Sequence, residues 1–173
     1  MTDKELVRRI RGGESELMEQ LIGAHYDAVW RFCLYKTGRP SAAYDLTQET
    51  FARFLLHFGQ YREQGKLQAY LFRLALNLIR DGWRAHPEEL PLPEEEEAAD
   101  TGFEEDILLR DAVERALARL PEGQRDVIRL HYWEGMKLAE IAQILSISLP
   151  AVKSRLKQGK EKLFHYLNQE GLP

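Results

Sequence analysis

Apolar residues along this chain recur three and four positions apart, and no stretch alternates apolar and polar residues in the manner of a half-buried strand. This pattern predicts an all-α fold. The expected helices cover Asp3–Arg11, about Glu14–Lys36, about Ala42–Phe58, Ala69–Arg84, Ile107–Leu120, Gln124–Trp133 and two segments within Leu138–Leu163. Several of the breaks between them carry glycine or proline, two residues that disfavour a helix interior.

The pattern over Asp3–Arg11 is that of a polar helix, whereas most of the other expected helices have one apolar side, which we assign to a core. In the N-terminal half the inward positions are Leu17, Leu21, Ala24, Ala28 and either Val29 or Phe32, then Leu46, Phe51, Phe54 and Leu55, then Leu71, Leu74, Ala75, Leu78 and Ile79. In the C-terminal half they are Ile107, Leu108, Ala112, Ala116, Leu117, Leu120, Leu138, Ile141, Ala142, Leu145, Val152, Leu156 and Leu163.

The segment Leu138–Leu163 has the pattern of two helices that meet across a tight turn. The first helix stops at Ser146, and Ser148 can cap the second by accepting a backbone amide hydrogen bond, with Pro150 tolerated in its first turn. Ser146 occupies the turn position where glycine is usual, so a left-handed backbone there costs about 1 kcal/mol. We therefore predict a helix-turn-helix.

The second helix of this pair carries a cationic side. Lys153, Lys157 and Lys160 fall at i, i+4 and i+7, with Ser154 and Gln158 beside them. A lysine-rich amphipathic helix is often only a solvated surface helix. Here it follows a turn of the right length and a short first helix, which favours a recognition helix that enters the major groove of DNA.

The charge distribution divides the chain into three blocks. The net charge is −4, which is unusual for a DNA-binding protein, but residues 87–106 carry ten acidic side chains and no basic one. Both flanking blocks are mildly basic, so the total charge conceals them. Three prolines and the acidic excess predict an extended linker over 87–106, between two small helical domains over 1–86 and 107–173.

Composition also excludes several classes of protein. No apolar run is long enough to span a membrane, and the N-terminal sequence lacks the apolar centre of a secretion signal. Cys33 is the only cysteine, which excludes an internal disulfide and favours a reducing cytosol. The histidines (His25, His57, His86, His131 and His165) are scattered without ligand spacing, so we expect no metal and no cofactor. Asp45 and Glu49 alone form no acid–base site.

A second polar face lies on the expected helix Ala69–Arg84. Its members, opposite the apolar side, are Arg73, Asn77, Arg80, Asp81 and Arg84. Guanidinium groups bind phosphates and an amide can read a base edge, while Tyr61 in the preceding loop and Trp83 can stack on unpaired bases. The stripe therefore suits single-stranded or distorted DNA, although a plain amphipathic helix would show the same periodicity.

Three motifs in one order resemble the sigma-70 superfamily, and specifically the extracytoplasmic function (ECF) sigma factors. DLTQETF at residues 45–51 resembles the family's DLxQExF segment, and residues 69–84 are similar to its WLxxIAxNxxxDxxR segment. Residues 120–163 follow its promoter-reading domain almost throughout. Tyr70 stands where the family usually has tryptophan. The basic run that commonly follows Arg84 is absent here, which implies fewer contacts to duplex DNA.

The resemblance implies a role for each polar face. It implies that Asp45, Leu46, Gln48, Glu49 and Phe51 dock on the clamp helices of the largest subunit of RNA polymerase. It implies that Tyr61 and Asn77, with Arg73, Arg80, Asp81 and Arg84, take the minus 10 element and a base flipped from the non-template strand. It implies that Lys153, Ser154, Lys157 and Gln158 face the minus 35 element while Arg125, Arg155 and Lys160 hold phosphates.

The resemblance also implies a monomeric, non-enzymatic initiation factor of the bacterial cytoplasm that binds core RNA polymerase and promoter DNA and is held inactive by an anti-sigma factor. Two alternatives remain. One is a helix-turn-helix regulator with an N-terminal sensing domain, which the absence of βα alternation before residue 87 disfavours. The other is a recombinase or transposase fragment, which would need clustered carboxylates or a serine nucleophile.

Overall fold

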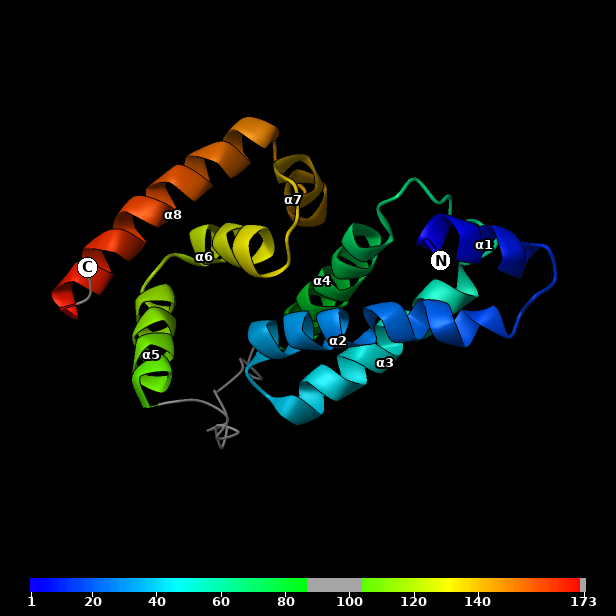
Figure 1. The fold of residues 1–173 in the computed structure, drawn as a ribbon, viewed down its shortest axis with the longest axis horizontal. Helices are drawn as coiled ribbons and strands as arrows, with labels where there is room; N and C mark the ends of the chain where they lie inside the picture. Colours follow the sequence, from blue (N-terminus) through cyan, green and yellow to red (C-terminus); the bar gives the residue numbers. More distant parts are fainter. Residues whose placement is uncertain (87–103, 172–173) are drawn as a thin grey trace. The chain divides into compact units, whose positions relative to one another are not determined.

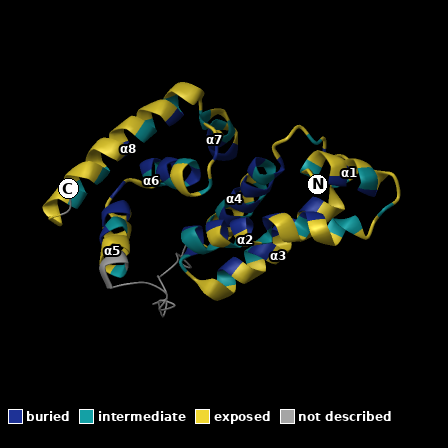
Figure 2. Cartoon of the chain, in the orientation of Figure 1, coloured by how far each residue is buried: buried dark blue, intermediate teal, exposed yellow. Residues whose placement is uncertain are grey.

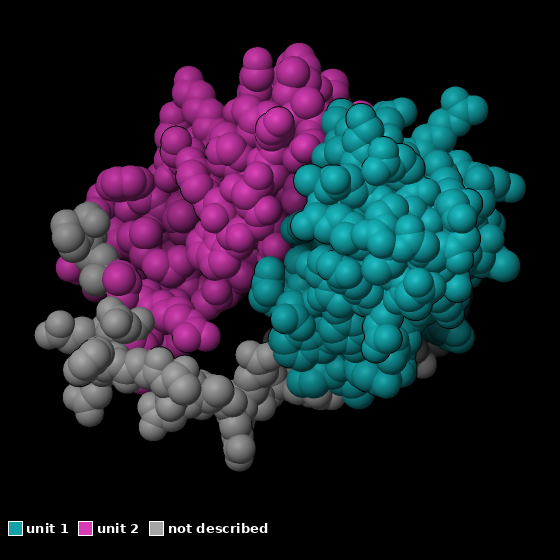
Figure 3. Space-filling view, turned by 45° about the vertical axis from the view of Figure 1, so that its right-hand side comes forward, with its two compact units in different colours: residues 1–95 teal, residues 96–173 magenta. Residues whose placement is uncertain are grey.

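The computed structural model describes residues 1–86 and 104–171, and within these ranges all regular structure is helical (Figure 1). The chain divides into two compact units, Met1–Glu95 and Glu96–Pro173, coloured separately in Figure 3. The prediction of an all-α fold is confirmed. Residues 87–103 of the predicted linker lie outside the described residues, and 104–106 belong to the first helix of the second unit.

The first unit contains α1 (Asp3–Arg11), α2 (Leu17–Thr37), α3 (Pro40–Leu56) and α4 (Leu67–Ala85). Local sequence sets their ends. Thr2 and Glu5 form a reciprocal capping box at the start of α1, which satisfies amides that have no intrahelical partner. Gly38, at φ 66°, ends α2 in the left-handed conformation, and Pro40 then begins α3.

Aromatic rings form much of the core of the first unit. Phe32 of α2 stacks on Phe72 of α4 with ring centres 4.9 Å apart, and Phe54 of α3 is 1% exposed. Figure 2 shows the buried residues of this unit along the inner sides of its helices. The buried face of α4 consists of Leu67, Ala69, Leu71, Phe72, Ala75, Leu76 and Ile79.

Several predicted core positions of the first unit are wrong. Ala24 and Leu55 are exposed, whereas His25 and both Val29 and Phe32 are buried. On α4, Leu74 and Leu78 are only partly buried, and the face that packs is centred on Phe72, Ala75 and Leu76. Apolar residues lie on more than one side of α2, α3 and α4, so the period alone leaves the direction of the core undetermined by about one residue.

The second unit contains α5 (Glu104–Ala118), α6 (Glu122–Ile128), the π-helical turn η1 (Arg129–Trp133), α7 (Leu138–Leu145) and α8 (Leu149–Gln169). Its core joins Leu117, Leu120 and Ile128 to the partly buried Val113, Leu156, Leu163 and Tyr166. Leu108, predicted as a core residue, is instead 68% exposed, because it precedes the part of α5 that packs. The predicted helix Gln124–Trp133 starts earlier, at Glu122, and widens at η1.

The turn between α7 and α8 agrees with the sequence prediction. Ser146 has φ 55° and ψ 45°, which is the left-handed region, and the Ser148 hydroxyl accepts a hydrogen bond of 3.2 Å from the amide of Ala151. Val152 of α8 is fully buried, while Ile141, Ile144 and Leu145 form the buried side of α7. The helix-turn-helix is confirmed, with Leu138 and Ala142 only partly buried.

Candidate nucleic-acid interface

The outer face of α3 presents a cluster of polar side chains. Asp45, Gln48 and Glu49 are exposed and Leu46 is half-buried, because the opposite side of the helix packs through Thr47 and its neighbours. The side chain of Glu49 pairs with Arg53 at 3.0 Å. The Gln48 amide donates to the hydroxyl of Tyr44, which is 52% exposed, so Tyr44 extends this face although the sequence analysis did not select it.

Phe51 does not lie on that outer face. It is 4% exposed and stacks on Tyr26 of α2, with ring centres 5.8 Å apart and planes 11° apart. Six residues separate it from Asp45, which turns its side chain toward α2 rather than outward. Its assignment as a surface contact is therefore corrected: Phe51 fixes α3 against α2 and so supports the exposed residues.

The polar stripe of α4 is present on the surface. Arg73, Asn77, Asp81 and Arg84 are exposed, while Arg80 is half-buried. Asp81 and Arg84 approach to 3.7 Å, and both side chains are more than two-thirds exposed. An ion pair at this exposure contributes little stability, so both groups remain available to a ligand.

Tyr61 differs most from its predicted position. It is 7% exposed, and its ring packs edge-on against Phe54 with centres 5.6 Å apart. The phenol donates a 2.8 Å hydrogen bond to Glu63. Burial, followed by that carboxylate, raises the pKa of Tyr61 far above its ordinary value. The polar loop had suggested an exposed aromatic, but the ring is drawn into the aromatic cluster of the core.

Tyr70 connects Tyr61 to the surface of α4. The rings of Tyr61 and Tyr70 have centres 4.9 Å apart, and the guanidinium of Arg73 lies 5.9 Å from the centre of the Tyr70 ring. Tyr70, Arg73 and Asn77 share one side of α4 by their spacing. Tyr70 is therefore an aromatic packing residue that belongs to the candidate site.

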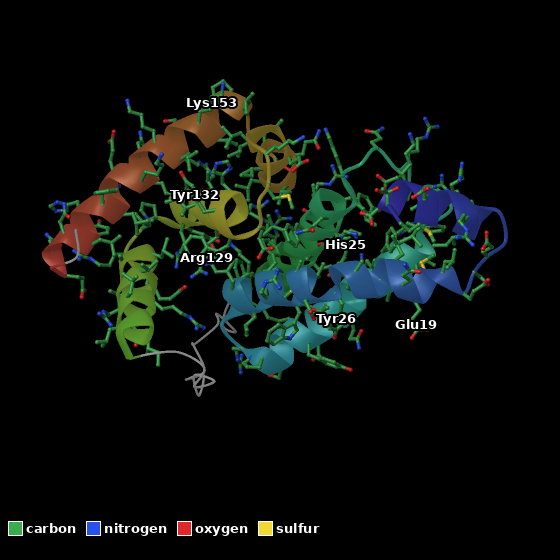
Figure 4. All side chains as sticks on the ribbon, viewed as in Figure 1. Glu19, His25, Tyr26, Arg129, Tyr132 and Lys153 are labelled. Carbon is green, nitrogen blue, oxygen red and sulfur yellow. The ribbon has the colours of Figure 1, made fainter. Side chains whose placement is uncertain are left out.

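The outer face of α8 carries the three predicted lysines. Lys153, Lys157 and Lys160 are exposed, as is Ser154, and Lys153 stands near the N-terminal end of α8 (Figure 4). The lysines line an open hollow of about 350 Å³ together with Leu138, Leu156 and Glu161. A hollow lined by both lysine and leucine side chains can hold phosphates and accept base methyl groups.

The remaining predicted residues of the second unit lie where α6 meets α8. The side-chain carbonyl of Gln158 accepts a 3.3 Å hydrogen bond from the side-chain amide of Gln124. The half-buried Arg155 lies directly against Gly123: a Cβ added to Gly123 would lie 2.8 Å from Nη1 of Arg155. Arg125 is also half-buried. These contacts give Gln158 and Arg155 a structural role at the helix junction, in addition to any contact with a ligand.

The described residues contain neither a candidate metal cluster nor a membrane-spanning helix. Over residues 1–86 and 104–171 no group of three or more histidine, cysteine, aspartate or glutamate side chains is placed to hold a metal ion. None of the helices described is long and apolar enough to cross a bilayer.

Two family matches cover these surfaces. Residues 21–87, which include most of α2 and all of α3 and α4, match sigma-70 region 2, and residues 110–163 match sigma-70 region 4. The ECF RNA polymerase sigma factor SigL of Mycobacterium tuberculosis is 31% identical over 92% of this chain and 93% of its own length. The chain belongs to the ECF RNA polymerase sigma factors.

Three further proteins are similar to this chain in sequence or in fold. The ECF sigma factor SigW of Bacillus subtilis is 26% identical over 94% of this chain and 95% of its own length. The structure of CnrH, in complex with the cytosolic domain of CnrY, covers 96% of this chain and 97% of its own, with 25% identity and a TM-score of 0.70. RpoE of Bartonella quintana, in complex with the anti-sigma factor NepR, covers 87% and 96% at 19% identity, with a TM-score of 0.73.

Proposed function

We propose that this chain binds core RNA polymerase, directs it to specific promoters and helps to open the DNA, without catalysing a reaction itself. The observation that carries the proposal is the pairing of an exposed Arg/Asn stripe on α4 with a lysine-rimmed recognition helix, α8, in the two units that match sigma-70 regions 2 and 4. One polar surface suits the melted strand and the other the duplex.

The outer face of α3 supplies the polymerase contact in this proposal. Asp45, Gln48 and Glu49 are exposed on a helix whose other side is fixed by buried Thr47 and Phe51, so the carboxylates are presented on a rigid support. This face would dock on the clamp helices of the largest polymerase subunit. Its acidic groups need no catalytic role.

The two DNA elements are divided between the units. In the first unit, Asn77 and the arginines of α4 would take the minus 10 element, with a base flipped from the non-template strand. Extruding that base costs a few kcal/mol, which contacts in the pocket offset. In the second unit, the lysines of α8 would take the minus 35 element. Lys153, Ser154 and Lys157 are free to approach base edges, and Lys160 a phosphate.

An anti-sigma factor completes the proposed set of partners. Both similar structures are complexes with a second protein, the anti-sigma factor NepR in one and the cytosolic domain of CnrY in the other. We propose that this chain, a monomer in the bacterial cytoplasm when free, is likewise held by a protein that covers its polymerase and DNA surfaces.

The first test is multi-round transcription from a randomised promoter library with core RNA polymerase, with and without this chain. We expect promoter-specific transcripts only in the mixture. Asn77→Ala should weaken selection at one position of the minus 10 element, and Lys153→Ala should weaken selection in the minus 35 element, each by about 5- to 100-fold in affinity for the preferred sequence.

Matched substitutions control for general damage. Asn168→Ala and Lys162→Ala replace exposed residues of the same types outside the two surfaces, and both should leave the selected sequences unchanged. Retained binding to duplex DNA without any transcripts or core binding would identify a helix-turn-helix regulator instead and would refute the proposed function.

A further inference from the structure

The loop that follows α3 is held in place by a residue far away in the sequence. The guanidinium of Arg11, the last residue of α1, donates to the carbonyl oxygen of Tyr61 and, at 3.4 Å, to that of Phe58. Its central carbon lies 5.6 Å from the centre of the Phe58 ring. Carbonyl groups at and just beyond a helix C-terminus have no helical amide to accept from. A cation there donates hydrogen bonds to them and also interacts favourably with the negative end of the helix dipole.

Arg11 can act as a fixed point because α1 is itself anchored. Leu6, Val7 and Ile10 are buried against the rest of the unit. At the other end of α1, Asp3 pairs at 2.9 Å with Nε2 of His25, a buried residue of α2 labelled in Figure 4. A helix held at both ends presents its terminal guanidinium in one position.

The loop transmits this position to α4. The loop is closed by local hydrogen bonds. The backbone amide of Tyr61 donates to the carbonyl of His57 at 3.1 Å. The Glu63 carboxylate accepts hydrogen bonds from both the Tyr61 hydroxyl and the amide of Gly65. The Tyr61 ring then contacts Tyr70, over which the Arg73 guanidinium lies. A continuous set of contacts therefore runs from α1 to the polar stripe of α4.

We propose that Arg11 is a positioning residue for capture of the melted strand: it fixes the loop 58–65, and through it the Tyr61–Tyr70 pair that supports Arg73 and the neighbouring Asn77. The inference rests on the proposed function. The match to sigma-70 region 2 begins at residue 21, so α1 and Arg11 lie before it. A loop that is already ordered in the free protein loses less conformational entropy when DNA binds, and this strengthens binding.

The test is a double-mutant cycle between protein and promoter, using core polymerase, the full chain and a promoter obtained from the library selection. The equilibrium fraction of open complex is measured by 2-aminopurine fluorescence in the melted region. With Arg11→Ala, the equilibrium constant for promoter opening should be five- to tenfold smaller. With an abasic site at the captured non-template position, wild type and Arg11→Ala should become equal within about twofold, because the pocket has nothing to bind.

Three further variants keep the cycle interpretable. Arg8→Ala removes an exposed arginine of the same helix and should behave as wild type. Arg11→Lys keeps the charge but can donate to one carbonyl more readily than to two, and should recover part of the loss. Glu63→Gln weakens the partner of the Tyr61 hydroxyl and should show the same dependence on the captured base, even if Arg11→Ala proves too unstable to study.

Two results would overturn the proposal. One is an unchanged opening constant for Arg11→Ala and Glu63→Gln on the intact promoter. The other is a loss that is equally large on the abasic promoter, which would mean that the loop stabilises the unit without acting on the captured base. Failure of the proposed function is distinguishable from both, since the wild-type chain would then give no promoter-specific open complex at all.

Discussion

Cys33 lies at the centre of the first unit, where its side chain is fully buried. Burial raises the pKa of the thiol to about 11, with the Thr47 hydroxyl acting weakly in the opposite direction. A thiol reacts as its thiolate, so at pH 8 only about one molecule in a thousand is reactive on this account. The cysteine is therefore structural, in agreement with its apolar neighbours in the sequence VWRFCLY.

We predict that Cys33 resists Ellman's reagent in the folded chain at pH 8 and reacts fully within seconds in 6 M guanidinium. Because the thiol pKa is higher in the folded state than in the unfolded state, its contribution to stability is fully present below about pH 8.5 and is lost as the pH rises toward 11. Fast labelling of the native protein at pH 8 would show that the core around Cys33 opens readily.

The exposure of each side chain decides which candidate site residues can contact a ligand directly. The charged and amide side chains of α3, α4 and α8 that the sequence selected are mostly exposed, whereas the aromatic ones, Phe51 and Tyr61, are buried. An aromatic ring gains more from burial than from solvent contact, so its neighbours in space determine where it lies. Those neighbours, Tyr26, Phe54 and Tyr70, are distant in sequence or on other helices.

At the scale of elements, the turn between α7 and α8 holds two opposing contributions to stability. Ser146 adopts the left-handed backbone conformation. This conformation is unfavourable by about 1 kcal/mol for any residue that has a Cβ atom. Ser148 caps α8 through its hydroxyl, and such caps contribute about 1 kcal/mol. The turn is therefore strained at one residue and stabilised two residues later.

We expect Ser146→Gly to raise the free energy of unfolding of the second unit by up to about 1 kcal/mol, because glycine adopts this conformation without strain. Ser148→Ala should lower it by about 1 kcal/mol through loss of the cap. Urea unfolding followed by circular dichroism measures both. A destabilising effect of Ser146→Gly would mean that the serine side chain makes a contact that outweighs its backbone strain.

For the molecule as a whole, each of the two units has a core of its own. Phe32 and Phe72 stack within the first unit, and Leu117, Leu120 and Ile128 pack together within the second. Each family match also falls inside one unit. Two cores on separate stretches of chain favour two cooperative unfolding units.

Phe72→Ala should remove about 3–5 kcal/mol from the stability of the first unit only, because a fully buried ring leaves a cavity. In calorimetry of the full chain we expect one transition to shift down by tens of degrees or vanish while the other stays in place. Faster labelling of Cys33 would assign the shifted transition to the first unit. A common shift of the whole endotherm would show instead that the two cores unfold together.

The sequence by itself determined the helical class, the positions of most helices, the capped turn at Ser146 and Ser148, and the polar residues of the candidate surfaces. These are local properties: periodicity, caps, turn chemistry and charge act over a few neighbouring residues. The family motifs added the order of the surfaces along the chain. The first of these motifs begins at residue 45, so none of them includes α1.

Only the tertiary structure decided the direction of each packed face to within a residue, and which residues support the surfaces. Leu55 is exposed and Tyr61 buried because the core lies where α2, α3 and α4 converge, a direction that no single helix specifies. Arg11 reaches Tyr61 across fifty residues of sequence. Contacts of that separation depend on how the helices pack against one another, and helical periodicity does not encode them.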